Sequence, residues 1–325
     1  MVNGLMNRIL LTGLLVLVLF PVNLAAEPYR ESIYGSQVTS NLIYGTGATN
    51  NGNSTANLRL DLYRPTDIGN GAVPANNPAL VLIHGGGFIS GSKNDLAQAG
   101  QIFASFGYTV ALINYRLSGS NPPLEPGPAS NMTPPAPPYA TLPNPQGINI
   151  VNAAVNDATK AMQWMHDNAA TYGFDPNRIG IGGASAGAVT ALMQAYNNPA
   201  PQVTPKVVIS YLGSMYNSQS SIEPGDAPAF IVAGALETVV PPNDSVVLAN
   251  ELTAKGIHNE LFMQPGVGHT VDYFKLYGGI SLLEHQIDFL ATYLVPEPGT
   301  WALATIAAVG LLAVARRRSS RQAVR

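Results

Sequence analysis

The sequence predicts an α/β fold with a mostly parallel central sheet that is flanked by helices on both faces. Short, wholly apolar segments recur along the chain, as expected for strands that are buried on both sides. Helical segments separate these strands, and such an alternation is typical of a parallel sheet. The expected strands are residues 79–83, 109–115, 178–182, 207–212 and 229–233. A chain of 325 residues has room for one domain of this type.

The predicted domain spans residues 58–294. It opens with residues 58–63, which alternate apolar and polar side chains as a half-buried strand does. Residues 27–57 before it are polar and rich in Gly and Asn, so we expect a loose N-terminal arm or an edge hairpin. Helices are expected over residues 95–106, 152–172 and 243–255.

A proline-rich excursion interrupts the predicted domain at residues 118–150. Ten prolines lie in this stretch, so it cannot form regular structure throughout. Because it lies inside a domain, we do not interpret it as a disordered linker. It either covers the active site as a lid or loops into solvent, and we favour the lid.

A predicted strand-turn-helix carries a serine at its turn. Residues 183–187 read Gly-Ala-Ser-Ala-Gly, with the apolar strand before them and residues rich in helix formers after them. A turn this sharp requires residues without bulk two positions before and two after the serine, and Gly183 and Gly187 meet that requirement. The geometry would expose the Ser185 hydroxyl and leave the amide of Ala186 free at a helix N-terminus.

A second glycine motif, His84-Gly-Gly-Gly87, directly follows the buried strand 79–83. Consecutive glycines allow the backbone to approach a ligand closely and to direct its amides inward. With residues 183–187, this motif resembles the HGGG branch of the α/β-hydrolases, which contains carboxylesterases and hormone-sensitive-lipase-like enzymes. The resemblance implies that Ser185 is the nucleophile and that the amides of Gly86, Gly87 and Ala186 form an oxyanion hole. It also implies that His84 supports the loop structurally.

The same resemblance implies an acid and then a histidine after the nucleophile. His269 lies in a glycine-flanked loop after the predicted strand 260–263, where the family keeps its base. Glu237 stands where most relatives carry Asp, in a loop after strand 229–233. For the acid, Asp244 is the second choice and Asp272 the third. The other histidines after the nucleophile are His258 and His285, and we expect both at the surface.

Both ends of the chain are predicted to be targeting signals. Residues 1–26 contain Arg8, an apolar run and small residues near Ala26, as in a cleaved signal peptide, with a membrane anchor as the alternative. Residues 295–325 contain Pro-Glu-Pro, an apolar helix and an arginine cluster, and they resemble the PEP-CTERM sorting signal of Gram-negative bacteria. This resemblance implies an exosortase partner, transient inner-membrane contact through the helix, and delivery to the cell surface, extracellular matrix or periplasm. A plain tail anchor is the alternative.

Composition excludes several functions. The net charge is −3 and charged residues make up 11% of the chain, so nothing indicates a nucleic-acid partner. The chain has no cysteine, which excludes disulfides and thiol nucleophiles. The implied chemistry needs neither a metal nor a cofactor.

Together these features predict an exported serine hydrolase that cleaves carboxylic esters through an acyl-enzyme. Short acyl chains are expected, with acetyl or feruloyl esters of polysaccharides among the candidate substrates. A serine peptidase of the prolyl-oligopeptidase type shares the same catalytic residues and is one alternative. A non-catalytic surface binding protein on a hydrolase fold is the other.

Overall fold

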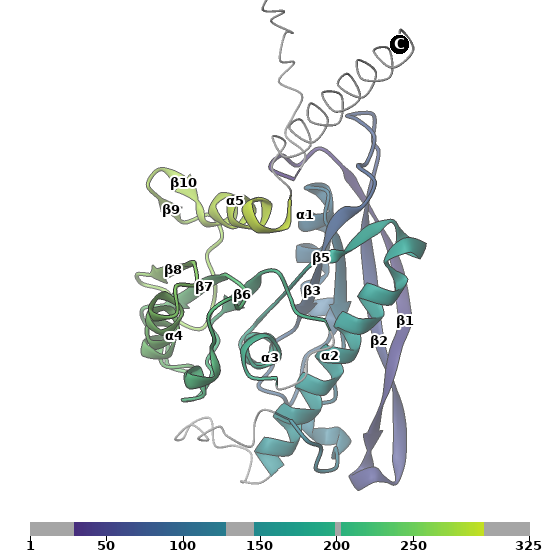
Figure 1. The fold of residues 1–325 in the computed structure, drawn as a ribbon, viewed down its shortest axis with the longest axis vertical. Helices are drawn as coiled ribbons and strands as arrows, with labels where there is room; N and C mark the ends of the chain where they lie inside the picture. Colours follow the sequence, from purple (N-terminus) through teal and green to yellow (C-terminus); the bar gives the residue numbers. More distant parts are fainter. Residues whose placement is uncertain (1–28, 128–145, 199–202, 296–325) are drawn as a thin grey trace, which may run out of the picture.

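A central sheet of eight strands organises the protein, shown by a computed structural model that describes residues 29–127, 146–198 and 203–295 (Figure 1). The strand order is β1-β2-β4-β3-β5-β6-β7-β8. Pairing is parallel from β4 across to β8, whereas β1 and β2 run antiparallel at one edge. The strands are β1 Gly35–Thr49, β2 Ser54–Thr66, β3 Asn77–Ile83, β4 Thr109–Ile113, β5 Phe174–Ala184, β6 Val208–Tyr211, β7 Ala229–Gly234 and β8 Asn259–Gln264.

Helices cover both faces of this sheet, which confirms the predicted fold class. They are α1 Ala97–Ser105, α2 Gln146–Tyr172, α3 Ala186–Tyr196, α4 Pro242–Ala254 and α5 Leu282–Leu294. One apolar cluster joins the sheet to α2, α3 and α4, and it contains Met162, Val189 and Leu248. The other cluster joins the opposite face to α1 and α5 through Phe103 and Phe289. Helices and sheet therefore form three layers (Figure 1).

The N-terminal segment is part of the sheet. Of the two alternatives predicted for residues 27–57, the loose arm is wrong, and the structure forms the edge hairpin instead. Strand β1 pairs with β2 from Gly35↔Thr66 to Thr49↔Ser54, and the short 3-10 helix Asn50–Gly52 connects them. Strand β2 also begins before the expected residue 58. Backbone hydrogen bonds hold β1 in the sheet. Because most of its side chains are exposed or half-buried, its sequence lacks an apolar pattern.

The proline-rich excursion ends earlier than predicted. Helix α2 begins at Gln146, so residues 146–150 are helical rather than part of the excursion. Residues 128–145 lie outside the described part of the chain, and the lid therefore stays a prediction. A short two-stranded hairpin, β9 Leu276–Tyr277 and β10 Ile280–Ser281, leads into α5.

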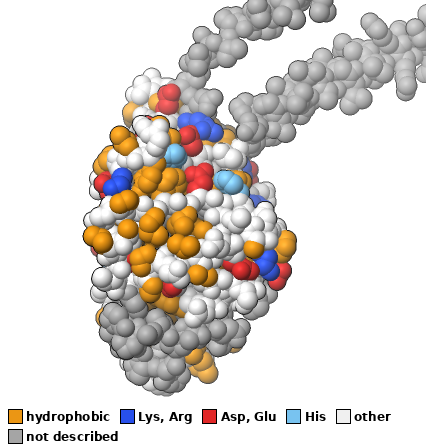
Figure 2. Space-filling model, turned by 90° about the vertical axis from the view of Figure 1, so that its left-hand side faces the viewer, with side chains coloured by type: hydrophobic (Ala, Val, Ile, Leu, Met, Phe, Trp, Pro, Cys, Tyr) orange, Lys and Arg blue, Asp and Glu red, His pale blue; other side chains and the backbone are white. Residues whose placement is uncertain are grey.

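Residues 1–28 and 296–325, which contain the predicted signal peptide and the apolar helix of the sorting signal, also lie outside the described residues. Among the helices that the structure describes, none combines the length and the apolar character needed to cross a membrane. On the face that contains α4, β8 and the β9–β10 hairpin, apolar side chains gather in the middle, and charged side chains lie above and beside them (Figure 2).

A buried ion pair joins the β4 end of the sheet to α2. Arg116 follows β4 and donates from Nη2 to Asp157 Oδ1 at 2.8 Å and from Nε to Asp157 Oδ2 at 2.9 Å. The side chain of Arg116 is 2% exposed and that of Asp157 is fully buried. Arg116 also donates to the carboxylate of Glu125 and to the carbonyl of Ala48 in β1. Asp157 is therefore an internal hydrogen-bonding group.

Candidate active site

Ser185 lies between β5 and α3 with φ 54° and ψ −121°, a backbone conformation that is strained for a residue with a side chain. The glycines around it are sterically required. A Cβ at Gly187 would lie 2.0 Å from the carbonyl oxygen of Ile83, and one at Gly183 would lie 2.5 Å from the carbonyl carbon of Gly187. The amide of Ser185 donates to the carbonyl of Tyr211 at 2.8 Å, which fixes the turn against β6. The serine side chain is thus held at the carboxyl end of the sheet.

A histidine and a carboxylate form a hydrogen-bonded line with this serine. His269 Nε2 lies 2.9 Å from Ser185 Oγ, and His269 Nδ1 lies 2.6 Å from Glu237 Oε2. Glu237 follows β7 and His269 follows β8, so adjacent parallel strands bring them to the same edge of the sheet. The other carboxylate oxygen of Glu237 accepts hydrogen bonds from the amides of Val239 and Val240.

Burial differs along this line. The side chain of Glu237 is 1% exposed, whereas that of His269 is 28% exposed. Glu237 is therefore held by fixed partners in a dry environment, while the imidazole can be reached from outside. A neutral imidazole with Nδ1–H donating to Glu237 leaves Nε2 as an acceptor for the serine hydroxyl.

The other candidate residues are placed elsewhere. Asp244 accepts a hydrogen bond from Ser214 Oγ at 2.6 Å, and Asp272 accepts one from the amide of Phe274 at 3.0 Å. His258 is exposed, as expected. His285 is half-buried, since its Nε2 lies 3.0 Å from the carbonyl oxygen of Tyr277. The expectation of a surface position for His285 is therefore wrong, because its ring also packs against a phenylalanine of β8.

The glycine motif after β3 lines the same cavity as Ser185 and His269. Gly86 has φ 106° and Gly87 has φ 61°, and a Cβ at Gly86 would lie 2.0 Å from the carbonyl oxygen of Ser90. The amide of Ala186 is the first of α3, and amides in the first turn of a helix have no acceptor within the helix. The glycine loop and the start of α3 therefore meet at Ser185.

His84 has a structural environment. It is 1% exposed, its Nδ1 lies 2.7 Å from the carbonyl oxygen of Gly85, and its ring stacks on Tyr115 with centroids 4.5 Å apart. Burial lowers the pKa of His84 below its usual value and favours the neutral ring. The hydroxyl of Tyr115 donates to the carbonyl of His84 at 3.2 Å. The packed rings of His84 and Tyr115 therefore support the glycine loop from the protein interior.

The cavity at Ser185 has a volume of about 500 Å³. Its walls include side chains that the motifs did not predict: Leu212, Val239, Thr270, Val271 and Tyr273. Burial raises the pKa of the Tyr273 hydroxyl above its usual value, so this group is neutral at physiological pH. These residues come from three loops that only the folded sheet brings together. Within the described residues, no group of three or more His, Asp or Glu side chains could hold a metal ion.

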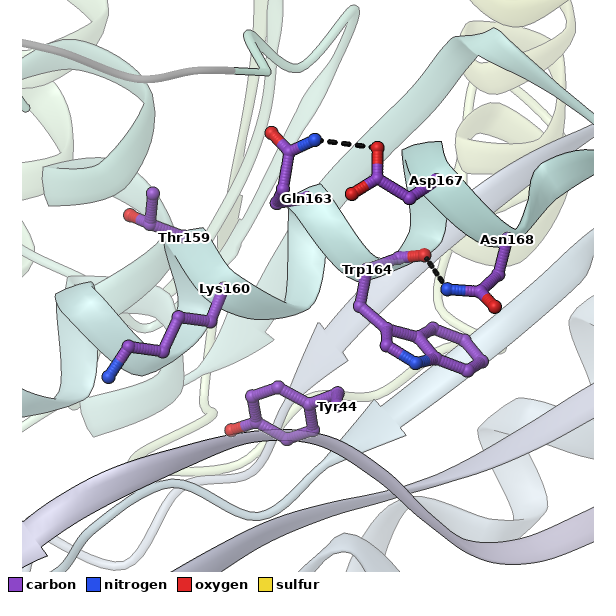
Figure 3. Close-up of a pocket in the computed structure, with 7 residues that line it drawn as sticks. All are labelled: Tyr44, Thr159, Lys160, Gln163, Trp164, Asp167 and Asn168. Carbon is purple, nitrogen blue, oxygen red and sulfur yellow. Dashed lines mark hydrogen bonds between the residues drawn. The ribbon is translucent and has the colours of Figure 1, made fainter.

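Another pocket, of about 340 Å³, lies between α2 and β1 (Figure 3). Its polar groups already have partners within the protein: Gln163 donates to Asp167 at 2.7 Å and Asn168 to the carbonyl of Trp164 at 2.8 Å. Lys160 donates to the carbonyl of Thr46 in β1 at 2.9 Å. The contact of Lys160 attaches α2 to the edge strand. The remaining lining residues are Tyr44 and Thr159.

Comparison with known protein families agrees with this geometry. The BD-FAE family model, which describes α/β-hydrolase esterases, matches residues 60–124 and 146–222. These ranges contain the HGGG motif and the serine turn. The PEP-CTERM protein-sorting motif matches residues 294–319, which confirms the predicted sorting signal.

Individual relatives are esterases and related hydrolases. The chain is 32% identical over 153 residues to phenmedipham hydrolase of Pseudarthrobacter oxydans, covering 47% of this chain and 26% of that protein. It is 27% identical over 171 residues to chlorogenic acid esterase of Aspergillus niger, covering 52% of this chain and 28% of that protein. The match thus spans only about a quarter of the length of these two relatives.

A solved structure shares most of the fold. The native structure of a thermophilic esterase, Est2 of Thermogutta terrifontis, superimposes with a TM-score of 0.57 at 20% identity, covering 81% of this chain and 95% of that one. The sheet and its helices therefore define an α/β-hydrolase fold. The chain thus has the α/β-hydrolase fold and is similar in sequence to esterases, and its residues 294–319 match the PEP-CTERM protein-sorting motif.

Proposed function

We propose that this protein is an exported serine esterase in which Ser185, His269 and Glu237 form the catalytic triad. His269 Nε2 takes the hydroxyl proton while Ser185 Oγ attacks the ester carbonyl carbon. Glu237 holds the Nδ1–H tautomer and stabilises the imidazolium that forms. The amides of Gly86, Gly87 and Ala186 donate hydrogen bonds to the developing oxyanion.

Two steps complete the reaction. The tetrahedral intermediate collapses, its bond to the alcohol oxygen breaks, and the imidazolium returns the proton to that oxygen. Water then attacks the acyl-enzyme with His269 again as base, which releases the carboxylic acid and restores the serine hydroxyl.

One observation carries this proposal, namely the continuous line from Glu237 Oε2 through His269 to Ser185 Oγ, with contacts of 2.6 and 2.9 Å. These distances fall within the hydrogen-bonding reach that proton transfer requires. The sequence similarity to named esterases supports ester cleavage as the reaction.

The sorting signal supports a location outside the inner membrane. We propose that an exosortase processes the C-terminal segment after transient membrane contact, and that the domain then reaches the cell surface, extracellular matrix or periplasm. At such a location the substrates would be small esters from outside or acetylated and feruloylated polysaccharides. Release of acetate from acetylated glycans tests this substrate class, and absence of release would remove it.

The test of the activity uses the purified protein with p-nitrophenyl acetate and p-nitrophenyl butyrate, beside its Ser185→Ala variant. We expect hydrolysis by the wild type and a loss of about 10⁶-fold in kcat in the variant. Thermal unfolding of both proteins controls for folding. Cleavage of prolyl peptides without cleavage of esters would instead support a peptidase, and no turnover of either would support a binding protein.

A further inference from the structure

A second cavity, of about 280 Å³, lies next to the cavity at Ser185. It extends between α1, the carboxyl ends of β3, β5 and β6, and the start of α5. The two cavities share Ala184 and Tyr273 as lining residues. The remaining walls are mostly apolar: Leu82, Leu96, Ala99, Ile102, Phe103, Gly183, Tyr211, Phe274 and Leu283, with Asp95 and Gln98 as polar members.

We propose that this second cavity receives the tail of the acyl group, so that Ala184 and Tyr273 form the neck through which a medium-length acyl chain leaves the reacting carbonyl. The proposal rests on the esterase function proposed above and goes further, because it assigns the acyl part of the substrate to a place in the fold. It extends the acyl range beyond the short chains expected from the sequence.

The position of Ala184 supports the neck. This residue directly precedes Ser185, and its side chain packs with the apolar cluster on the α1 and α5 face of the sheet. Because alternate side chains of a strand point to opposite faces, a residue at the end of β5 can reach that face while the serine turn faces the first cavity. The methyl group of Ala184 leaves space that any longer side chain would take up. A small residue here therefore keeps the two cavities in contact.

The opposite wall of the neck is aromatic. Tyr273 is 37% exposed, and its ring meets that of Tyr211 edge to face with centroids 5.5 Å apart. Tyr211 is buried and its hydroxyl donates to the side-chain carbonyl of Gln286 in α5. The Tyr211 ring is thus held against α5, and the Tyr273 ring packs on it while remaining partly exposed. Such a wall can accommodate an alkyl chain without leaving polar groups unpaired.

The floor and the rim of the second cavity differ in character. Leu82 and Phe103 at the floor are each 4% exposed, whereas Asp95 and Gln98 at the rim are exposed. Phe274 at the rim is 78% exposed and offers further apolar area. An acyl chain would replace water on apolar surface at the floor, while the polar rim stays hydrated. Each methylene that is fully buried in this way would raise kcat/KM by about fourfold.

The experiment compares kcat/KM for p-nitrophenyl acetate, butyrate, octanoate and dodecanoate in three proteins. These are the wild type, Ala99→Phe, which fills the cavity from α1, and Gln101→Phe, which adds the same ring at an exposed position of α1. We expect the wild-type ratio of octanoate to acetate to fall at least tenfold in Ala99→Phe. The acetate value should stay within threefold, and Gln101→Phe should leave the ratio unchanged.

Ile102→Phe fills the same cavity from the next turn and serves if Ala99→Phe does not fold, as judged by thermal unfolding. An unchanged octanoate-to-acetate ratio in the folded variants would overturn the acyl-tail assignment. Acetate hydrolysis that persists in them, and that Ser185→Ala abolishes, would leave the esterase proposal intact. Lack of ester hydrolysis in the wild type would instead remove the esterase proposal itself.

Discussion

Two buried carboxylates occupy opposite kinds of environment in this fold. Asp157 is fully buried, and the permanently charged Arg116 holds both of its oxygens. Glu237 is nearly as buried, but its partner His269 is 28% exposed and also lies 2.9 Å from the Ser185 hydroxyl. The fold encloses the first pair, whereas the second pair extends to a serine hydroxyl that lines a cavity. The difference separates a pair suited to holding elements together from one suited to moving a proton.

The location of each pair agrees with this distinction. Arg116 connects β1, the end of β4, α2 and Glu125 through its hydrogen bonds, so one guanidinium joins four segments. Burial raises the pKa of Asp157, and the hydrogen bonds from Arg116 oppose that effect. Glu237, in contrast, contacts only its own loop and His269 in the hydrogen bonds that the described residues make.

The largest expected effect comes from neutralising the carboxylate of the proposed triad. Glu237→Gln keeps the size of the side chain but removes the charge that stabilises an imidazolium, and we expect kcat on p-nitrophenyl acetate to fall about 10⁴-fold. The free energy of unfolding should change by about 1 kcal/mol or less, because Gln keeps the volume of the buried side chain. Glu223→Gln at an exposed position is the control. A variant that keeps most of its activity would show that Glu237 is not the triad acid.

The corresponding change at the other pair should affect stability instead of turnover. Asp157→Asn leaves Arg116 buried with one carboxylate fewer, and we expect the free energy of unfolding to fall by about 3 kcal/mol. Denaturant titration measures this loss, while kcat of the folded variant at low temperature should stay near the wild-type value. Asp167→Asn, an exposed change on the same helix, should have an effect within about 0.5 kcal/mol. Equal losses of unfolding free energy in Asp157→Asn and Asp167→Asn would contradict the structural role proposed for the Arg116–Asp157 pair.

The smallest expected effect concerns His84, a third buried titratable group, whose Nδ1 lies 2.7 Å from a backbone carbonyl oxygen. Burial holds its folded pKa below the unfolded value of 6.5, so the unfolded chain binds the proton first as the pH falls. Its contribution to stability is therefore present above pH 6.5 and is lost below it. We expect the stability difference between wild type and His84→Gln to shrink from pH 7 to pH 5 in denaturant titrations. Parallel pH curves for the two proteins would contradict this.

The residues of the proposed site could be predicted because each of them lies in a short sequence motif or directly after an apolar strand. Ser185 and the HGGG loop each depend on glycines within a few positions, and Glu237 and His269 follow apolar strands. The structure brings these side chains into hydrogen-bonding distance. The fold class followed from the alternation of buried strands and helices, which the sheet confirms.

Other features could not be predicted because they depend on contacts between distant residues. Strand β1 is held by backbone pairing and has few buried side chains, so no apolar pattern marks it. The partners Arg116 and Asp157 are separated by 41 positions, so the local sequence around either residue does not reveal the pair. Tyr273 becomes a wall of the cavity only because the loop after β8 returns to the end of β6.

The backbone at Ser185 has a consequence for how this protein can evolve. Its φ of 54° and ψ of −121° are readily adopted by glycine and cost a residue with a side chain about 1–3 kcal/mol. A change from serine to glycine at this position would therefore make the folded domain more stable while removing the hydroxyl. Selection for hydrolysis and selection for stability act in opposite directions on this residue. A lineage that no longer needs turnover would gain thermal stability from the same substitution that removes the proposed nucleophile.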